Sequence, residues 1–287
     1  MVFAERLALL LSHRPLGLIT DLDGTISPIA PTPRQARVDP RCRRLLKGLL
    51  GLLELVAVLS GRPAAEARRM VGLPGRAIPL RGSPGPGGLG KKGVVYIGHH
   101  GLSRWDQGRE EMLPGAEPFA ALAAQARREL SHLETMPGLL LEDKAFGLSI
   151  HYRQAPSAAA ARRAILAAVA ASPSAQALSL HEGRRLVELR PPLADKGKAL
   201  ERLAAECGLR GAIYLGDDLT DVDAFEALKG LRQGGKVAGL AVAVASPEAP
   251  PALLDGADLT VDGVEGVAAL LAELAAALTA SGRQRGQ

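Results

Sequence analysis

Short runs of consecutive apolar residues alternate with amphipathic segments along most of the chain. These runs lack the alternation of a half-exposed strand, so each predicts a strand that is buried on both faces. Such strands are expected at 16–20, 55–59, 94–97, 212–215 and 240–244. Helical periodicity occurs between and around them, at 40–51, 63–71, 196–207, 223–228 and 264–278. Buried strands that alternate with helices are typical of an α/β protein with a parallel sheet.

The middle of the chain follows a different pattern. Two helices are each followed by two strands, with the helices at 117–133 and 157–171 and the strands at 139–142, 148–152, 177–181 and 186–190. This order predicts a compact α+β unit with an antiparallel sheet. We therefore expect a Rossmann-like core of residues 1–112 and 191–287, interrupted by an inserted cap domain at 113–190. A loop rich in glycine and proline is expected at 81–93, and a frayed tail at 279–287.

Composition places the chain among ordinary globular proteins. It has 287 residues, of which 47% are hydrophobic and 23% charged. Its two cysteines, Cys42 and Cys207, cannot form a disulfide framework, which is typical of a reducing cytoplasm. No uninterrupted apolar run approaches the roughly 20 residues that cross a bilayer. Residues 1–11 contain Glu5 and Arg6 and no cleavage site, so we expect no signal peptide, no membrane partner and a cytoplasmic protein.

The net charge of +5 raises the possibility of an anionic partner. Only 3% of the residues are aromatic, and no basic run is interleaved with aromatic residues. Single-stranded nucleic acids are bound on aromatic stacking platforms, which this chain lacks. A phosphorylated metabolite therefore fits the charge better than a nucleic acid, and we expect a monomer that binds a small molecule.

Three of the apolar strands end in polar motifs: Asp-Leu-Asp-Gly-Thr at 21–25, Ser-Gly-Arg at 60–62 and Gly-Asp-Asp at 216–218. Each alone has an ordinary structural explanation, as a turn or as a helix cap. Ligands of open α/β sheets bind outside the carboxyl ends of the strands, so the motifs are expected to converge. Convergence would gather five carboxylates, Asp21, Asp23, Asp217, Asp218 and Asp221. Oxygen ligands of this kind predict a hard cation, Mg²⁺ above all.

At this point the sequence resembles the haloacid-dehalogenase-like phosphatases. Asp-x-Asp-Gly-Thr is their first motif, and Ser60, Lys196 and the Gly-Asp-Asp strand end match the other three. Residues 216–225 further resemble the fourth motif of trehalose-6-phosphate phosphatases. Other segments of that family are similar to 60–62, 141–144, 151–153 and 187–191, so the resemblance spans about 16–270. The sequence departs from the family where Leu102 and Ser103, rather than an acid, follow Gly101, and at Val222, where an acid is common.

The resemblance implies a role for each matching residue. Asp21 would be the nucleophile that forms an aspartyl-phosphate, and Asp23 would be the general acid and base. Lys196 would stabilise the charge of the nucleophile and of the transition state. Mg²⁺ would be held by Asp21, by the Asp23 backbone carbonyl and by Asp217. The resemblance implies that the phosphoryl oxygens are bound by Gly24, Thr25, Ser60 and Gly61. It also implies that Asp218 and Asp221 orient the water molecules that bind the metal.

Substrate recognition is expected to involve the cap. Glu142, Lys144 and Glu188 resemble the sugar-binding groups of the family, and Arg62 and His100 would complete the pocket from the core. His151 and Arg153 have two open interpretations, as sugar-binding residues or as exposed charges on a cap strand edge. His99 and His181 are expected to be surface residues.

The expected activity is Mg²⁺-dependent hydrolysis of trehalose 6-phosphate to trehalose and phosphate, the last step of trehalose biosynthesis. One alternative is a phosphatase of the same superfamily that acts on sucrose phosphate, a mannosyl-phosphoglycerate or glucosylglycerol phosphate. Another is a non-catalytic module that binds a sugar phosphate and regulates a synthase.

Overall fold

A computed structural model describes residues 3–77, 92–183 and 185–285. The chain divides into two compact units, Met1–Glu111 with Asp195–Gln287, and Met112–Ala194. We describe each unit separately. The expected glycine- and proline-rich loop falls mostly outside the described residues, which resume at Lys92.

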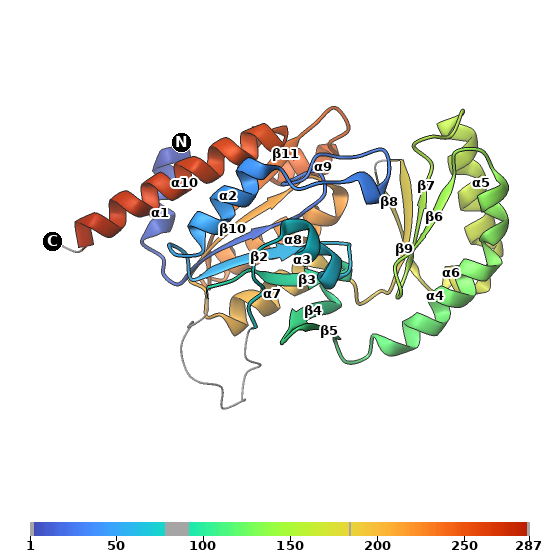
Figure 1. Cartoon of the computed structure of the whole chain (residues 1–287), viewed down its shortest axis with the longest axis horizontal. Helices are drawn as coiled ribbons and strands as arrows, with labels where there is room; N and C mark the ends of the chain where they lie inside the picture. Colours follow the sequence, from blue (N-terminus) through green and yellow to red (C-terminus); the bar gives the residue numbers. More distant parts are fainter. Residues whose placement is uncertain (1–2, 78–91, 184, 286–287) are drawn as a thin grey trace. The chain divides into compact units, whose positions relative to one another are not determined.

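The larger unit is built on one eight-stranded sheet of order β12-β11-β10-β1-β2-β3-β4-β5 (Figure 1). Neighbours from β12 to β3 pair in parallel, and β4 is antiparallel to β3. The strands are β1 (Leu16–Thr20), β2 (Leu55–Leu59), β3 (Val95–Gly98), β4 (Ser103–Asp106), β5 (Arg109–Met112), β10 (Gly211–Gly216), β11 (Ala238–Ala245) and β12 (Leu259–Asp262). This arrangement confirms the predicted α/β class with a mostly parallel sheet.

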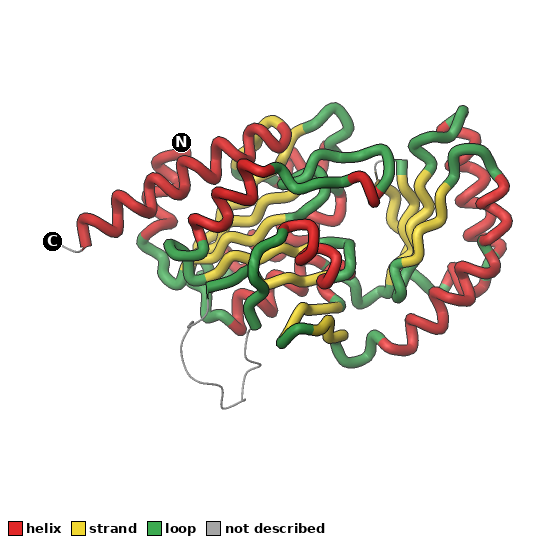
Figure 2. The backbone as a smooth tube through the Cα atoms, viewed as in Figure 1, coloured by secondary structure: helices red, strands yellow, loops and turns green. Residues whose placement is uncertain are grey.

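Helices cover both faces of this sheet, which makes three layers (Figure 2). The helices of the larger unit are α1 (Phe3–Leu11), α2 (Pro40–Leu49), α3 (Ala64–Val71), α7 (Lys196–Glu206), α8 (Leu219–Gln233), α9 (Pro251–Gly256) and α10 (Gly263–Arg285), with 3-10 turns at Pro33–Gln35 and His99–Gly101. Residues of α1, α2, α3 and α10 form one core with the sheet, and residues of α7, α8 and α9 form the other. Burial on both faces explains why the strands read as continuous apolar runs.

Local sequence explains where the helices near the strand ends begin. The side chain of Asp39 caps α2 by accepting hydrogen bonds from Arg41 N and Cys42 N, with Pro40 as the first helical residue. Asp195 caps α7 by accepting from Lys198 N at 3.0 Å. The Asp195 cap fixes the start of α7, whose first residue is Lys196.

The smaller unit is an antiparallel sheet of order β6-β7-β9-β8 with helices on one face. Its elements are α4 (Glu117–Glu129), a 3-10 turn (Ser131–Thr135), β6 (Leu140–Asp143), β7 (Leu148–His151), α5 (Ala158–Ala171), α6 (Pro173–Gln176), β8 (Ser179–Gly183) and β9 (Leu186–Arg190). Leu141, Ile150 and Val187 lie in register and are buried against α4 and α5. The helix-strand-strand order predicted for this segment is therefore present twice.

Several sequence-based expectations about elements were wrong. The pattern missed β12 and α9, and it missed the β4–β5 hairpin, whose residues are mostly polar and half-exposed. Gln107 and Gly108 connect that hairpin, both at positive φ, as a two-residue hairpin turn requires. Helix α8 extends beyond the predicted 223–228 at both ends: it begins after the N-cap residue Asp218, whose capping box includes Asp221, and it ends at Gln233 before Gly234. The expected frayed tail is instead helical to Arg285.

Helix α10 is long and apolar enough on average to span a membrane, although Glu265 and Glu273 interrupt it, so it is not an uninterrupted apolar run. Its stretch Gly263–Ser281 has 19 residues and is apolar and long enough to cross a membrane, by length and composition alone. Of this stretch, 39% is buried inside the unit, and Val267, Leu271 and Leu274 belong to the core. One face of α10 thus packs on the sheet as a core helix.

Candidate active site

The carboxyl ends of β1 and β10 bring two of the polar motifs together. The strands are parallel neighbours in the register Thr20 to Leu215, and Asp21 N donates a hydrogen bond to Leu215 O at 2.8 Å. Asp21 is therefore fixed next to the end of β10, where Asp217 follows the strand. Parallel pairing places these residues, nearly 200 positions apart in sequence, at one edge of the sheet.

A buried cluster of three carboxylates lies at this edge. The three carboxylates come close together: one oxygen atom from each of Asp21, Asp217 and Asp221 lies within 4.8 Å of the other two. Lys196 Nζ lies 2.9 Å from Asp21 Oδ1 and 2.7 Å from Asp221 Oδ1, and its side chain is 2% exposed. Burial would lower the pKa of Lys196, but the charges of Asp21 and Asp221 outweigh it and raise that pKa. Burial also raises the pKa of Asp21 to about 7, although Lys196 opposes the rise.

Asp221 is saturated with hydrogen-bond donors. Its Oδ1 accepts from Lys196 Nζ and from Tyr214 Oη, each at 2.7 Å. Its Oδ2 accepts from the backbone amides of Asp217 and Asp218 at 3.0 and 3.1 Å. Four donors use the roughly four lone-pair sites of a carboxylate. Asp221 therefore holds Lys196 and the end of β10 in place.

Asp217 is positioned by the loop after β1. Its Oδ1 accepts a hydrogen bond from Thr25 Oγ1 at 3.0 Å, and both residues are buried. Gly24 has a φ of +89°, and a Cβ there would overlap the Asp217 carboxylate. Glycine is required at this position both for its backbone conformation and for the close approach of the loop to β10.

The donor set of this cluster fits a hard divalent cation. Three buried carboxylates face a single ammonium group, so negative charge is in excess, and oxygen donors are those that Mg²⁺ prefers. Since Asp221 is saturated within the protein, Asp21 and Asp217 are the carboxylates suited to ligate a metal. Asp21 and Asp217 both belong to the predicted ligand set, and its third member, the backbone carbonyl of Asp23, stays a prediction.

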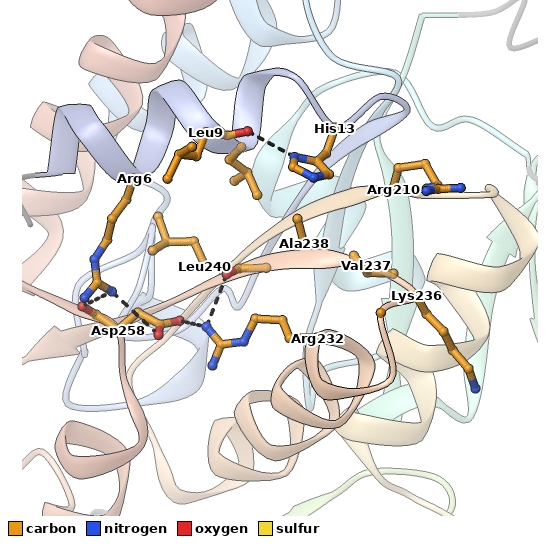
Figure 3. Close-up of a pocket in the computed structure, with 13 residues that line it drawn as sticks. Arg6, Leu9, His13, Arg210, Arg232, Lys236, Val237, Ala238, Leu240 and Asp258 are labelled. Atoms are coloured by element: carbon orange, nitrogen blue, oxygen red, sulfur yellow. Dashed lines mark hydrogen bonds and ion pairs between the residues drawn. The ribbon is translucent and has the colours of Figure 1, made fainter.

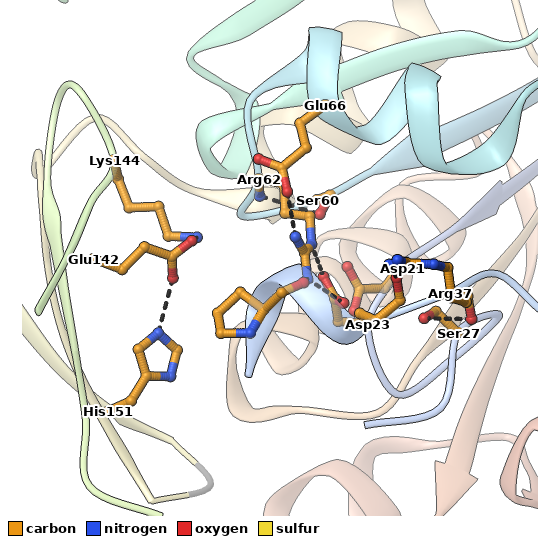
Figure 4. Close-up of polar contacts among 12 residues, drawn as sticks. Asp21, Asp23, Ser27, Arg37, Ser60, Arg62, Glu66, Glu142, Lys144 and His151 are labelled. Atoms are coloured by element: carbon orange, nitrogen blue, oxygen red, sulfur yellow. Dashed lines mark hydrogen bonds and ion pairs between the residues drawn. The ribbon is translucent and has the colours of Figure 1, made fainter. Parts of the chain in front are cut away.

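Asp23 is held by Arg62 rather than by the acid cluster (Figure 4). Arg62 Nε donates to Asp23 Oδ2 at 2.6 Å, and Nη2 donates to Oδ1 at 2.9 Å. The same guanidinium contacts Glu66 and donates to Pro33 O at 3.0 Å. The Arg62 side chain is 6% exposed. The residue that was expected to contact the sugar thus makes its described contacts within the larger unit.

The loop after β2 is ordered by close packing. Ser60 Oγ accepts a hydrogen bond from Arg62 N at 3.1 Å, so it caps the turn before α3 and not α3 itself, whose N-cap residue is Pro63. A Cβ at Gly61 would lie 2.6 Å from His100 Nε2, so this glycine makes room for the imidazole. His100 is buried with a φ of +53°, an uncommon conformation for a residue with a side chain.

Sequence reasoning missed Glu110, which supports this loop from β5. Glu110 Oε1 accepts from Ala64 N at 2.7 Å and from Ser103 Oγ at 2.5 Å, and Oε2 accepts from Ala65 N at 3.2 Å. A carboxylate at these first amides of α3 complements the helix dipole. His99 Nε2 lies 3.6 Å from the same carboxylate. His99 is buried, so its expected place on the surface was wrong. No local motif marks Glu110, because its partners come from α3, β4 and the turn after β3.

The smaller unit carries the remaining predicted residues on one face of its sheet. The register aligns Glu142, Ser149, Glu188 and His181 in a row across the four strands, on the face opposite the apolar core. Glu142 contacts Lys144 Nζ at 2.9 Å and His151 Nε2 at 2.8 Å. Burial opposes ionisation of Glu142, but His151 and Lys144 outweigh it and lower its pKa to about 2.

Other residues of this face complete the arrangement. Glu188 Oε1 accepts a long hydrogen bond from Ser149 Oγ at 3.5 Å, and Arg190 Nη2 lies 3.1 Å from His181 Nδ1. His181 is half-buried rather than on the surface as expected, and Arg153 lies half-buried in the turn after β7. Sequence reasoning assigned no binding role to Ser149, His181 or Arg190, because only strand pairing places them beside Glu188.

The mostly parallel sheet, with the acid cluster at the carboxyl ends of β1 and β10, has the haloacid-dehalogenase-like fold. A haloacid dehalogenase-like hydrolase from Bacteroides thetaiotaomicron has the same fold, with a TM-score of 0.56 at 14% identity over 91% of this chain and 100% of that one. Residues 19–85 and 89–250 match the family model described as trehalose-phosphatase. The chain belongs to the trehalose-phosphatase family.

Individual relatives agree with this membership. The chain is 34% identical to a trehalose-phosphate phosphatase of Mycobacterium avium (strain 104) over 242 residues, which are 82% of this chain and 56% of the relative. It is 33% identical to that of Mycobacterium leprae (strain TN), over 78% of this chain and 50% of the relative. The chain thus spans about half the length of these curated relatives. The C-terminal domain of Candida albicans trehalose-6-phosphate phosphatase shares the fold, with a TM-score of 0.76 at 22% identity over 95% of this chain and 96% of that one.

Proposed function

We propose that this chain is a Mg²⁺-dependent phosphatase that hydrolyses trehalose 6-phosphate to trehalose and inorganic phosphate. The observation that carries the proposal is the buried cluster of Asp21, Asp217, Asp221 and Lys196 in a chain of the trehalose-phosphatase family. A phosphate monoester dianion repels nucleophiles, so its hydrolysis depends on neutralised charge and on positioning. A hard cation held by Asp21, Asp217 and the Asp23 carbonyl would neutralise phosphoryl charge and keep the nucleophile ionised.

In the proposed reaction a carboxylate oxygen of Asp21 attacks phosphorus, and the bond between phosphorus and the sugar oxygen breaks. Asp23 protonates the departing sugar oxygen and then accepts a proton from the water that hydrolyses the aspartyl-phosphate. Lys196 stabilises the ionised Asp21 before the attack and the phosphoryl charge during it. Gly24, Thr25, Ser60 and Gly61 supply amides and hydroxyls to the phosphoryl oxygens. Asp218 and Asp221 orient the water molecules that bind the metal.

The polar face of the smaller unit supports a sugar as the leaving group. Hydroxyls of a disaccharide need both donors and acceptors, and Glu142, Glu188 and Lys144 supply both. His151 and Arg153 add donors on and beside the same strand, while Arg62 and His100 belong to the larger unit. The same face would also suit sucrose phosphate, a mannosyl-phosphoglycerate or glucosylglycerol phosphate. Phosphate release from a panel of these sugar phosphates therefore identifies the substrate.

A purely regulatory role is the weaker alternative. The C-terminal domain of the Candida albicans trehalose synthase regulatory protein has this fold too, with a TM-score of 0.64 at 14% identity, so the fold by itself does not select catalysis. The complete set of acids, including Asp21, favours an enzyme.

Release of inorganic phosphate tests the proposal. We expect release from trehalose 6-phosphate with Mg²⁺, none with a chelator, and at least about a hundredfold loss in Asp21→Asn. The exposed carboxylate of Asp255 on α9 gives a matched control, and Asp255→Asn is expected to keep full activity. Near wild-type turnover by Asp21→Asn would contradict the assigned nucleophile.

Substrate choice is tested on the smaller unit. Glu188→Gln is expected to weaken turnover of trehalose 6-phosphate much more than that of p-nitrophenyl phosphate, which has no sugar. Glu182 lies on the adjacent strand β8, and its side chain is on the opposite face of the sheet from Glu188. Arg162 Nε lies 2.5 Å from Glu182 Oε2 there, so Glu182→Gln serves as the control. Equal losses on both substrates would remove the argument for sugar recognition by this face.

A further inference from the structure

Three buried polar side chains at the candidate active site come from elements that pack together. Tyr214 lies on β10, Lys196 is the first residue of α7, and Asp221 lies in the first turn of α8. Tyr214 belongs to the core that β10 forms with α7 and α8. Each of the three residues is at most 2% exposed. Their mutual contacts are therefore shielded from water and depend on how the two helices pack on the strand.

Tyr214 and Lys196 share one carboxylate oxygen. Tyr214 Oη and Lys196 Nζ each lie 2.7 Å from Asp221 Oδ1. Burial raises the pKa of Tyr214 well above its ordinary value, and the charge of Asp221 adds to the rise, so the hydroxyl keeps its proton. A hydroxyl that donates to an ionised carboxylate forms one of the stronger kinds of hydrogen bond. Tyr214 thus occupies a lone pair of the same oxygen that holds Lys196.

The ammonium group of Lys196 is divided between two carboxylates. Its Nζ lies 2.7 Å from Asp221 Oδ1 and 2.9 Å from Asp21 Oδ1. Without the tyrosine hydroxyl, Asp221 Oδ1 would carry less compensated charge and would attract the ammonium group more strongly. Movement of Nζ toward Asp221 would then lengthen its contact with Asp21. The hydroxyl therefore keeps the ammonium group within reach of both carboxylates.

The ring of Tyr214 is held in one orientation. Its centroid lies 6.0 Å from that of Phe225 on α8, and the two ring planes are 85° apart, an edge-to-face arrangement. Phe225 follows Asp221 by four residues, which places both on the same side of α8. The helix that carries the acceptor of the hydroxyl thus also supports the ring. On the other side, parallel pairing of β10 with β1 and β11 fixes the backbone of Tyr214.

We propose that Tyr214 is a positioning residue, whose hydroxyl holds Lys196 between Asp21 and Asp221. In the proposed reaction Lys196 stabilises the nucleophile and the charge of the transferring phosphoryl group, so its position affects the transition state more than substrate binding. The kinetic consequence of the inference rests on the proposed function. The position of the ammonium group is a property of the protein alone and is tested separately.

Tyr214→Phe removes the hydroxyl and keeps the ring. We expect kcat to fall at least about fivefold on both trehalose 6-phosphate and p-nitrophenyl phosphate, with KM within about twofold of wild type. Tyr96 gives a matched control, because it too is fully buried and its Oη donates to Leu73 O at 2.9 Å. It lies in the core on the other face of the sheet, so Tyr96→Phe is expected to keep kcat within about twofold of wild type.

A second control addresses the docking of α8 as a whole. In the last turn of this helix Arg232 Nη1 lies 2.5 Å from Asp258 Oδ2, in a pocket beside α1 and the amino-terminal end of β11 (Figure 3). Asp258→Asn weakens this ion pair and leaves the contacts of Tyr214 in place, so we expect wild-type kcat. A loss in Asp258→Asn as large as that in Tyr214→Phe would assign the effect to helix docking and overturn the proposal.

The signal of the Lys196 ammonium group tests its position directly. Nitrogen-15 NMR of lysine side chains is recorded on the metal-free protein with a chelator, and Lys196→Arg identifies the signal by its loss. We expect the signal to shift in Tyr214→Phe and to keep its place in Tyr96→Phe. An unshifted signal in Tyr214→Phe, or wild-type kcat in that variant, would overturn the proposal. If wild type releases no phosphate from either substrate while the signal shifts as expected, the proposed function fails and the positioning of Lys196 by Tyr214 stands.

Discussion

Arg62 donates two hydrogen bonds to the carboxylate of Asp23, at 2.6 and 2.9 Å, and so fixes the orientation of the proposed general acid and base. Each carboxylate oxygen has two lone pairs, and Arg62 uses one on each, so a proton can bind at the other. Arg62 therefore orients Asp23 and leaves room for proton transfer. This relationship gives Arg62 a positioning role that its place after Ser60 and Gly61 did not reveal.

Arg62→Lys should retain the charge but lose the paired contact, because an ammonium group does not match a carboxylate bidentately. Charge-assisted hydrogen bonds contribute about 1.5–3 kcal/mol each, so we expect kcat/KM for the sugar phosphate to fall by about tenfold to a hundredfold. Arg69 is exposed on α3 and does not contact Asp23, so Arg69→Lys is the control. Steady-state phosphate release measures the effect, and unchanged kinetics in Arg62→Lys would contradict the role.

Gly24→Ala should abolish activity, since the added Cβ would overlap the Asp217 carboxylate. Gly108 offers a matched control, because its φ of +94° is similar and nothing lies within 4 Å of its Cβ position. Gly108→Ala is expected to lose about 1–2 kcal/mol of unfolding free energy from backbone strain alone and to keep its activity. Phosphate release and urea denaturation measure the two effects, and an active Gly24→Ala would show that the loop does not need this close approach.

Glu110→Ala should destabilise the protein by about 1–3 kcal/mol, because it leaves the Ala64 and Ala65 amides without their acceptor. It should also lower kcat/KM, since the same carboxylate orders the loop that carries Ser60 and Gly61. The adjacent Glu111 pairs with the exposed Arg109, and Glu111→Ala is expected to stay within about 0.5 kcal/mol of wild type. Equal unfolding free energies of the two variants would exclude the supporting role.

The stability of the metal-free protein should depend on Asp21. Burial raises its pKa from 3.8 to about 7, against the opposing effect of Lys196. Because the folded value is the higher one, this contribution to stability is fully present below pH 3.8 and is lost as the pH rises through about 7. We expect wild type to lose stability relative to Asp21→Asn across this interval. Urea denaturation with a chelator measures the difference, and a constant difference would be inconsistent with the raised pKa.

The sequence by itself determined the alternation of buried strands and helices, because strands covered on both faces must be apolar throughout. It also determined that acids follow the first strand and the strand at 212–215, since these motifs are contiguous. Helix starts such as that at Pro40 follow from a capping residue and a proline, which are local features. The polar β4–β5 hairpin was missed and the length of α8 was underestimated, because both depend on contacts that the periodicity of a single segment does not contain.

Tertiary structure alone decided which carboxylates meet. The register of β1 with β10 places Asp21 beside Asp217. The four hydrogen bonds that Asp221 accepts hold it against Lys196 and the end of β10. Pairing of Arg62 with Asp23, and the support of α3 by Glu110, likewise depend on residues that are distant in the chain. Hydrogen bonds and ion pairs act over a few ångströms in space, so their partners are fixed only when the strands and helices pack together.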